Sequence, residues 1–445
     1  MFRIFLKNFI LFFTLSIISY NISANGALSI DITQESFKPI KIALMPIEND
    51  NAEIDKDMKA IYKTVKSDLR QAGYFRLINQ DAFIRGEKFG RLPLFEAWRQ
   101  IDVDAIIQIR LDEDDKNVKK LTTYIWDVKT GQQIEAQAIK AKSILNRRFA
   151  HIIADIILTT LTDEDAFFDT KIAFITESDH KRPSKNLAIM DQDGQNFSQL
   201  TDVGKDDLVL SPAFSPNPST IAFYGKFEDT EEVFIFDYNT GLYNSLYSFN
   251  GDMTLAPTFS KDGSKIAMSK QFENDFNLVE INLKNNRFKR LTHNKNLIDI
   301  SPSYNHDGSK LVFSSDRNSQ GQQLYVMDLT SKKVKRISFK GGNYSAPTWS
   351  PDGKTIAFVK AKKNVFYLGT IRPDGTKEKI LTSGWFLDSP SWAPNSQRIV
   401  YFKTRYDKKG RFVSRLYKIH SSGQFERLVR TVDNASNPNW SGLLE

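Results

Sequence analysis

The residue types that could carry chemistry are few in this chain and do not fall into catalytic spacings. The histidines are His151, His180, His293, His306 and His420, and none belongs to the His-Glu-x-x-His arrangement that binds zinc on one helix face. There is no cysteine, which excludes thiolate metal sites, thiol catalysis and disulfides. A Gly-x-Ser-x-Gly nucleophile motif and the common phosphate-binding glycine loops are also absent. The sequence therefore predicts no catalytic residue, no metal site and no cofactor.

Three acidic groups are the remaining candidates for metal or paired-carboxylate chemistry. One is a set of aspartates two to five residues before the blade prolines, which either line one end of the channel and attract a cation or a basic partner loop, or cap the entry turns: Asp207, Asp252, Asp299, Asp388 and Asp433. Residues 112–115 read Asp-Glu-Asp-Asp, which is typical of a solvated turn between strands. Asp191-x-Asp193-Gly194 resembles the start of a calcium loop but lacks a third ligand and the distal glutamate. We interpret it as a hairpin turn. The protein is accordingly predicted not to be an enzyme and to have no small-molecule substrate.

An internal repeat organises the C-terminal part of the chain. From Ser211 onward, a segment of the form Pro–x–aromatic–Ser, a turn and an Ile-Ala-Phe-like run recurs every 43 to 48 residues. The aromatic positions are Phe214, Phe259, Tyr304, Trp349, Trp392 and Trp440. Three copies have Asp-Gly in the turn, which supplies the positive φ that a tight hairpin needs. Four short strands per period of about 40–50 residues are typical of a β-propeller blade.

The two ends of the repeat region predict how the ring closes. Trp440 has only the aromatic half of a unit, whereas Ile172-Ala173-Phe174 begins a unit that lacks this half. Joined, they give one blade with one strand from the C-terminus and three from residues 171–200. The sequence thus predicts a six-bladed propeller over residues 166–445, closed by a one-plus-three strand latch that leaves no open strand edge.

Residues 40–165 alternate strand and helix patterns and predict an α/β domain. Apolar residues at helical spacing occupy residues 53–72, and Gly73 is a suitable C-cap. A helix over residues 144–161 is apolar over nearly two-thirds of its surface, so we expect it to be largely buried. Strands are expected at residues 40–47, 74–78, 105–111, 121–128 and 133–139, with a short helix at 93–100. The expected fold class is mainly β, with an N-terminal α/β domain that contains a mixed sheet.

The first 39 residues predict export. Arg3 and Lys7 precede an apolar run, and Ser23-Ala24 offers a cleavage site, so residues 1–24 are interpreted as a signal peptide removed near Ala24. A retained N-terminal anchor is the alternative. Residues 25–39 follow as a mobile N-terminal tail in which Leu28, Ile30 and Ile32 alternate with polar residues. This tail either forms an edge strand of the next domain or docks elsewhere.

The composition is that of a soluble globular protein, with 40% hydrophobic and 26% charged residues. The formal net charge is +8, but the basic residues are scattered, which argues against nucleic-acid binding. We expect a monomer whose function is recognition. Several loops before the first strand of a blade carry large apolar groups, which predicts an interface at that end of the propeller. These loops are residues 253–256, 297–300, 341–346 and 384–387.

The whole layout resembles the TolB family, the periplasmic component of the Tol–Pal envelope system. The resemblance spans the full chain. Its specific points are the segments FKPIKIALMPI, DLRQAGYF, AWRQIDVDAII and LTDEDAFFDTKIAFIT, together with repeats such as APTWSPDGKTIAFV. The order of domains and the segment LTDEDAFFDTKIAFIT, which joins them, are more specific to the family than the repeats, which many propellers share.

This resemblance implies a non-enzymatic periplasmic adaptor that supports outer-membrane integrity and envelope constriction during cell division. In the family, the tail after the cleavage site engages the inner-membrane protein TolA, which implicates Leu28, Ile30 and Ile32. The family's propeller face binds the peptidoglycan-associated lipoprotein Pal. The matching positions in this sequence are Met253, Thr254, Ala256, Asp299 and Ile300. A propeller scaffold of unrelated function and a propeller hydrolase remain as alternatives.

Overall fold

The structure is a computed structural model that describes residues 38–46, 51–114, 117–141, 146–177, 184–204, 206–227, 230–247, 253–318, 321–431 and 434–444. The predicted signal peptide, residues 1–24, and the tail residues Leu28, Ile30 and Ile32 lie outside these ranges. Within them, no helix combines the length and the apolar character that crossing a membrane requires.

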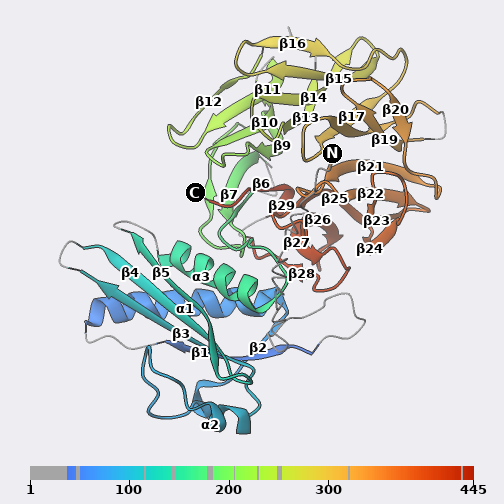
Figure 1. The fold of residues 1–445 in the computed structure, drawn as a ribbon. Coiled ribbons are helices and arrows are strands. Elements are labelled where there is room, and N and C mark those ends of the chain that lie inside the picture. The colour runs from blue at the N-terminus through green and yellow to red at the C-terminus, as the bar shows by residue number, and fades with distance from the viewer. Residues whose placement is uncertain are drawn as a thin grey trace, which may run out of the picture.

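An α/β unit occupies the N-terminal part of the described chain (Figure 1). Its five-stranded sheet has the order β2-β1-β3-β4-β5, in which β1 is parallel to β2 and β3, and the other pairs are antiparallel. The predicted mixed sheet is therefore confirmed. The strands are β1 (Ile40–Pro46), β2 (Phe75–Leu77), β3 (Ala105–Glu113), β4 (Lys119–Asp127) and β5 (Gln132–Ala141). The helices are α1 (Ala52–Ala72), η1 (Gln80–Ala82), α2 (Phe95–Gln100) and α3 (Asn146–Leu161).

The long helices follow from local sequence signals. The Asn51 side chain caps α1 by accepting from the Glu53 backbone N–H at 2.9 Å, and Gly73 ends the helix at φ +89°. Helices α1 and α3 lie beside each other and bury their apolar stripes in one core with the sheet. This core continues into the propeller through residues such as Phe168 and Trp440. The two parts of the molecule therefore share apolar packing.

The C-terminal part is a β-propeller of antiparallel sheets (Figure 1). Four sheets have four strands each. They are β13 (Thr254–Phe259), β14 (Lys265–Phe272), β15 (Asp275–Asn282) and β16 (Arg287–Arg290); β17 (Asp299–Tyr304), β18 (Lys310–Ser315), β19 (Gln323–Asp328) and β20 (Val334–Arg336); β21 (Asn343–Trp349), β22 (Ile356–Lys362), β23 (Val365–Ile371) and β24 (Lys379–Gly384); and β25 (Phe386–Trp392), β26 (Arg398–Tyr406), β27 (Phe412–His420) and β28 (Arg427–Leu428).

The remaining propeller strands form one eight-stranded sheet, so the pairing separates four blades rather than the six predicted. Two four-stranded groups in this sheet, β29-β6-β7-β8 and β9-β10-β11-β12, are joined by the single parallel pair of Lys185 and Leu208. The strands are β6 (Lys171–Glu177), β7 (Lys185–Asp191), β8 (Ser198–Gln199), β9 (Leu208–Phe214), β10 (Thr220–Phe227), β11 (Thr230–Asp237), β12 (Leu242–Ser245) and β29 (Asn434–Trp440). The predicted pairing of the C-terminal strand with residues 171–177 is confirmed by the β29–β6 ladder.

The first strand of each repeat carries a bulge that the sequence pattern did not predict. The residue before the repeat proline has positive φ in every copy: Ser211, Ala256, Ser301, Ala346, Ser389 and Asn437, with φ between 45° and 56°. A residue before proline normally adopts extended backbone, and non-glycine residues seldom have positive φ. The strand register shifts beside these residues. The repeated bulge therefore reshapes the inner strands, which contact one another in the closed circle β9-β13-β17-β21-β25-β29.

Candidate functional site

The loops before the first strand of each blade were predicted to form an interaction face. Met253 and Ile300 are half-buried, and Ala256 is half-buried at the bulge with φ +52°. Ile298, which precedes β17, is exposed, and its backbone N–H donates to Asp316 at 2.8 Å. Met253 and Ile298 stand at corresponding positions of two neighbouring blades, whose first strands, β13 and β17, contact each other.

Two other residues predicted for this face are buried. Thr254 and Asp299 begin β13 and β17, and both side chains are 0% exposed. Asp299 accepts two hydrogen bonds from Arg317 Nη2, at 2.8 and 3.0 Å, and one from Asn294 Nδ2 at 2.7 Å. In the structure neither side chain offers contact surface, and their part in partner binding stays a prediction. Through these hydrogen bonds, Asp299 instead links the loop before β17, which contains Asn294, to the loop after β18, which contains Arg317.

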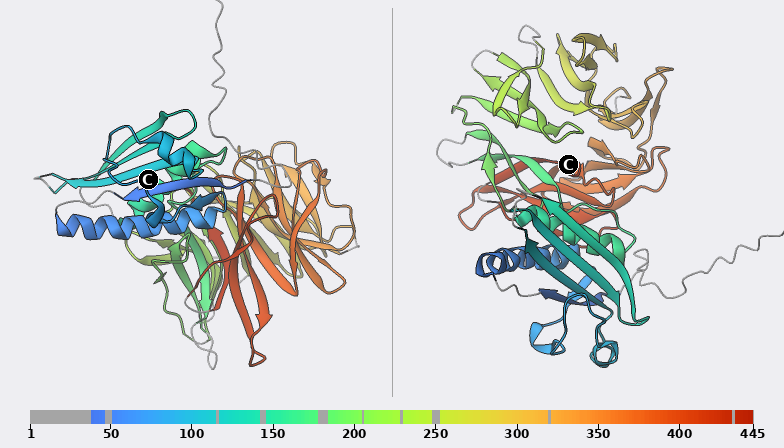
Figure 2. Two further views of the ribbon diagram at one scale, coloured as in Figure 1. Left: turned by 90° about the horizontal axis from the view of Figure 1, so that it is seen from below. Right: turned by 60° about the vertical axis from the view of Figure 1, so that its left-hand side comes forward.

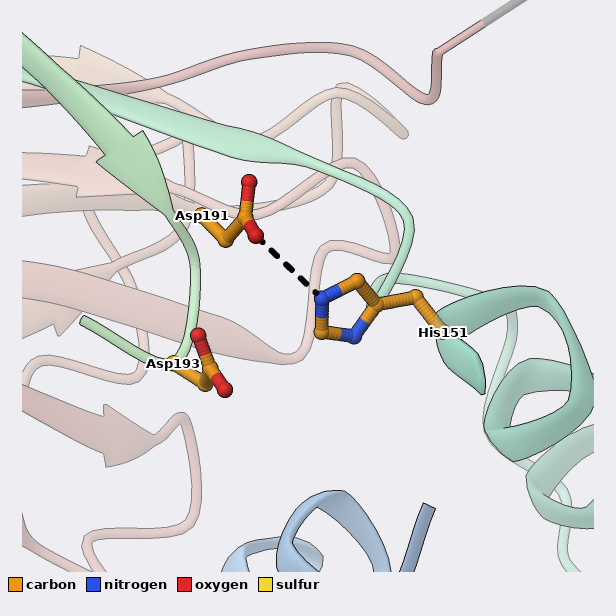
Figure 3. A group of neighbouring side chains, drawn as sticks. All are labelled: His151, Asp191 and Asp193. Atoms are coloured by element: carbon orange, nitrogen blue, oxygen red, sulfur yellow. Dashed lines mark ion pairs between the residues drawn. The ribbon is translucent and has the colours of Figure 1, made fainter. Parts of the chain in front are cut away.

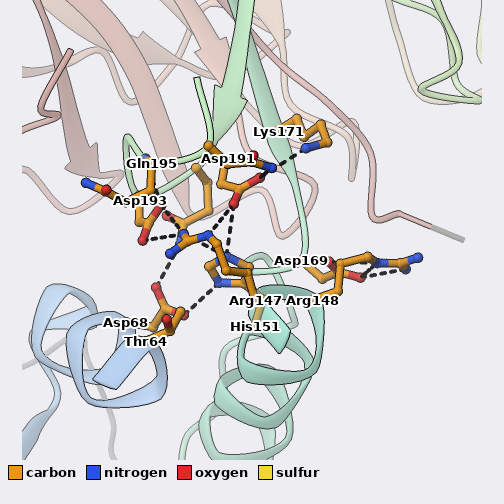
Figure 4. A network of polar contacts seen from close by, with 12 residues as sticks. Thr64, Asp68, Arg147, Arg148, His151, Asp169, Lys171, Asp191, Asp193 and Gln195 are labelled. Carbon is orange, nitrogen blue, oxygen red and sulfur yellow. Dashed lines mark hydrogen bonds and ion pairs between the residues drawn. The ribbon is translucent and has the colours of Figure 1, made fainter. Parts of the chain in front are cut away.

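A polar network missed by the sequence analysis lies where the α/β unit meets the propeller (Figure 4). Its centre is His151 on α3, whose Nδ1 lies 2.7 Å from Asp68 Oδ2 on α1. The Nε2 atom of His151 lies 3.7 Å from Asp191 Oδ2, at the end of the propeller strand β7. Burial alone would lower the pKa of His151, but the surrounding aspartates raise it to about 10. The imidazole is therefore protonated at neutral pH.

Arg147 joins the same two elements one helical turn from His151. Its Nε donates to Asp191 at 2.8 Å, and its Nη2 lies 2.8 Å from both carboxylate oxygens of Asp193. Asp191 and Asp193 belong to the predicted hairpin turn, which is confirmed by the hydrogen bond from the Gly194 N–H to the Asp191 carbonyl at 2.9 Å. The turn thus presents two carboxylates to α3.

The donor atoms of His151, Asp191 and Asp193 lie within 4.8 Å of one another, which raises the question of a metal site (Figure 3). A histidine binds a metal through an unprotonated ring nitrogen. His151 is an imidazolium at neutral pH, so both of its ring nitrogens carry protons. Arg147 already forms ion pairs with both carboxylates, and Lys171 forms another with Asp191. The arrangement fits an ion-pair network that fastens the two parts of the molecule, and it does not fit a cation site.

Further buried polar groups lie at the junction, meaning the region where the α/β unit meets the propeller. Lys418 on β27 donates to the Gln192 side chain at 2.6 Å, and Gln192 donates to Asp68 at 3.1 Å. Burial lowers the pKa of Lys418 to about 8. Nearby, Arg398 Nη2 lies 3.3 Å from both oxygens of Glu164, in the segment that links α3 to β6. The same nitrogen donates to the Ala72 carbonyl at 2.8 Å, at the end of α1.

Sequence profiles of two families match the chain. The family described as the TolB amino-terminal domain matches residues 28–134, and the family described as the TolB beta propeller domain matches residues 158–444. The two matches follow the order of the two structural units.

Curated relatives match over almost the whole chain. The Tol-Pal system protein TolB of Pelagibacter ubique is 36% identical and covers 95% of this chain and 96% of its own length. The protein of the same name from Wolbachia sp. subsp. Drosophila simulans is 38% identical over 94% of this chain and 95% of its own. The crystal structure of TolB from Acinetobacter baumannii has a TM-score of 0.79 at 24% identity, covering 91% of this chain and 97% of that one. The last comparison concerns the fold alone.

Proposed function

Because this chain belongs to the TolB family of Tol-Pal system proteins, we propose that it is a non-enzymatic periplasmic adaptor that links TolA to the peptidoglycan-associated lipoprotein Pal. In this role it maintains outer-membrane integrity and envelope constriction during cell division. The observation that carries the proposal is the similarity to named TolB proteins over both structural units and nearly the full chain. The sequence supports the proposal in a second way, since it lacks the nucleophile and metal-binding motifs of enzymes.

The lipoprotein is proposed to bind at the loops before β13 and β17. Met253, Ala256, Ile298 and Ile300 would supply the contact surface, since each has exposed or half-buried area. Asp299 would act as a positioning residue, because its ion pair with Arg317 fixes the end of the loop while its own side chain is buried. Apolar groups on a fixed backbone lose little conformational entropy on binding, which favours affinity.

TolA is proposed to bind residues 25–39, with Leu28, Ile30 and Ile32 as contacts. Residues 1–24 are proposed to be a signal peptide. We also propose domain limits of 40–165 and 166–445, and a propeller that works as six blades. The single residue pair that joins the halves of the eight-stranded sheet and the circle of inner strands support the count of six.

The proposal is tested by pull-down of the chain from Asn25 with Pal and with the C-terminal domain of TolA. We expect deletion of residues 25–39 to abolish retention of TolA only. The Met253→Asp/Ile300→Asp variant should lose Pal only, with the Kd raised at least about thirtyfold because carboxylates replace apolar contacts. A matched control is Leu242→Asp/Val334→Asp, which alters exposed apolar residues on outer strands.

Circular dichroism should show that every variant is folded. If the folded wild-type chain retains neither protein, the adaptor function is wrong and a scaffold of unrelated function replaces it. If the control variant loses Pal as well, the proposed face is wrong.

A further inference from the structure

Three aromatic side chains gather in the open at one end of the sheet β25–β28. Trp385, Tyr406 and Phe412 are 55%, 56% and 54% exposed. Their ring centroids lie 4.6 to 5.5 Å apart, and Trp385 and Phe412 are nearly parallel, at an interplanar angle of 23°. Burying these large rings away from water would be favourable. A contiguous exposed apolar patch of this kind marks an interaction site.

The cluster stands on a projecting hairpin. Strands β26 and β27 have nine residues each, whereas the corresponding strands of the other described sheets have six to eight. In the left view of Figure 2, this red hairpin reaches farther than the neighbouring strands. Tyr406 and Phe412 are the last residue pair before the tip. The rings are therefore at the outer end of a protrusion and do not line a groove.

The tip is held in one conformation by Asp407. Its carboxylate accepts from the backbone N–H groups of Lys409 at 2.7 Å and Arg411 at 2.9 Å, and from Arg411 Nε at 2.8 Å. Gly410 adopts φ +73° to complete the turn, where its N–H donates to the Asp407 carbonyl at 3.0 Å. The rings and the neighbouring charges are thus presented on a defined turn.

Positive charge surrounds the rings. Residues 403–415 contain six cationic side chains and a single acid, Asp407, which pairs with Arg411. One of the cations, Lys403, pairs with Glu426 outside this segment. Lys408 and Lys409 are exposed at the tip itself. Lys362 and Lys363 are exposed at the tip of the adjacent hairpin β22–β23, which contacts β25. The end of the propeller that carries the rings is therefore strongly cationic.

We propose that this surface, formed by Trp385, Tyr406 and Phe412 with Lys408 and Lys409, docks onto a bilayer that contains anionic phospholipids. Aromatic rings favour the headgroup level of a bilayer, and each nearby lysine or arginine is attracted by anionic headgroups. Both kinds of group reach outward together on this hairpin, as insertion into a flat bilayer surface requires. Aromatic anchors of a protein interface are enclosed in a desolvated pocket, which a protein partner would have to supply around this tip, whereas a bilayer surface needs no pocket.

Docking of this kind is weak and reversible, because it uses a few rings and a local charge rather than a spanning segment. It should weaken with added salt, which screens the charge attraction. The inference goes beyond the proposed adaptor function, since it requires neither TolA nor Pal.

The test is flotation of the chain from Asn25 with two kinds of vesicle, pure phosphatidylcholine and an equal mixture of phosphatidylcholine and phosphatidylglycerol. The wild-type chain should float with the mixed vesicles and much less with the neutral ones. Lys408→Glu/Lys409→Glu and Tyr406→Ser/Phe412→Ser should each reduce the partition coefficient by about tenfold or more. The matched control is Lys332→Glu/Lys333→Glu. These two exposed lysines lie in the turn between the third and fourth strands of another blade, β19 and β20, whereas Lys408 and Lys409 lie between the second and third strands of theirs. It makes the same charge change and should float like the wild type.

Failure of the folded wild-type chain to float with the mixed vesicles overturns the proposal. Equal losses in the tip and control variants overturn it as well, since net charge alone would then explain binding. If the tip variants leave flotation unchanged but weaken retention of Pal, the cluster is a protein interface. Pull-down of the wild-type chain with Pal and TolA is run separately, so failure of the adaptor function is recognised independently.

Discussion

Replacement of Arg398 with methionine is expected to lower the free energy of unfolding by about 3–5 kcal/mol, because it leaves the Glu164 carboxylate buried without its cation. Both side chains are almost fully buried. Burial alone would raise the pKa of Glu164, but Arg398 and His420 hold it below its usual value. Equilibrium urea unfolding, followed by tryptophan fluorescence and by circular dichroism, measures the loss.

The matched control is the double variant Arg398→Met/Glu164→Gln. Here the uncompensated charge is absent, and the glutamine can still accept from the Tyr74 hydroxyl, which bonds Glu164 in the wild-type protein. We expect the double variant to be clearly more stable than Arg398→Met alone. A double variant no more stable than Arg398→Met alone would contradict the assignment of the loss to an unpaired buried charge.

Replacement of His151 with leucine is expected to cost about 3 kcal/mol of unfolding free energy, for the related reason that Asp68 loses its charged partner. Asp68 is fully buried, and burial raises the pKa of its carboxyl. His151 is the main cation that opposes this and Lys418 a lesser one, while Gln192 supplies a neutral hydrogen bond at 3.1 Å. Because α1, α3 and the β7 turn meet at this histidine, the variant should also be cleaved faster by protease at the junction. Limited proteolysis and urea unfolding measure the two effects.

The pH dependence of stability distinguishes a charged His151 from a neutral packing residue. Its folded pKa, about 10, lies above the unfolded value of 6.5, so its stabilisation is complete below pH 6.5 and is lost as pH rises toward 10. Between pH 6.5 and 8 this contributes a loss of about 1.5 kcal/mol, which His151→Leu should not show. Above pH 8, Lys418 acts in the opposite sense, because its folded pKa of about 8 lies below its usual value. Identical slopes in wild type and variant between pH 6.5 and 8 would contradict a charged histidine.

The repeat and the α/β unit were predictable because their signals are local. Asp-Gly turns, the apolar run after each turn and the Gly73 cap lie within a few residues of the structure that they specify. The closing strand β29 was predictable as well. The C-terminal end of the repeat region has only the aromatic half of a unit, and the unit that begins at Ile172 lacks that half. The sheet count was less predictable, since one contact between Lys185 and Leu208 merges two groups of strands into one sheet.

The bulge residues and the polar junction were not predictable. Serine or alanine before proline gives no local sign of positive φ, so the bulge at Ala256 could not be predicted from the residues beside it. The junction joins Asp68, His151 and Asp191, which are far apart in sequence and have no recognisable spacing. The turn at Asp191 could be predicted, but nothing near it indicates that Arg147 would meet its carboxylates.

Burial separates the predicted face into two kinds of residue. Asp299 and Met253 looked alike in sequence, as loop residues before the first strand of a blade. In the structure, the aspartate is enclosed by Arg317 and Asn294, whereas the methionine keeps part of its surface. An acidic residue beside an arginine of the next hairpin cannot be recognised as buried without the register of β17 and β18.

We propose that this chain binds Pal through the loops before β13 and β17. The most direct test is isothermal titration calorimetry of the chain from Asn25 with the soluble domain of Pal. We predict saturable one-to-one binding that Met253→Asp/Ile300→Asp abolishes and Leu242→Asp/Val334→Asp preserves. The claim is contradicted if the folded wild-type chain shows no binding, or if the face variant binds Pal as tightly as the wild-type chain.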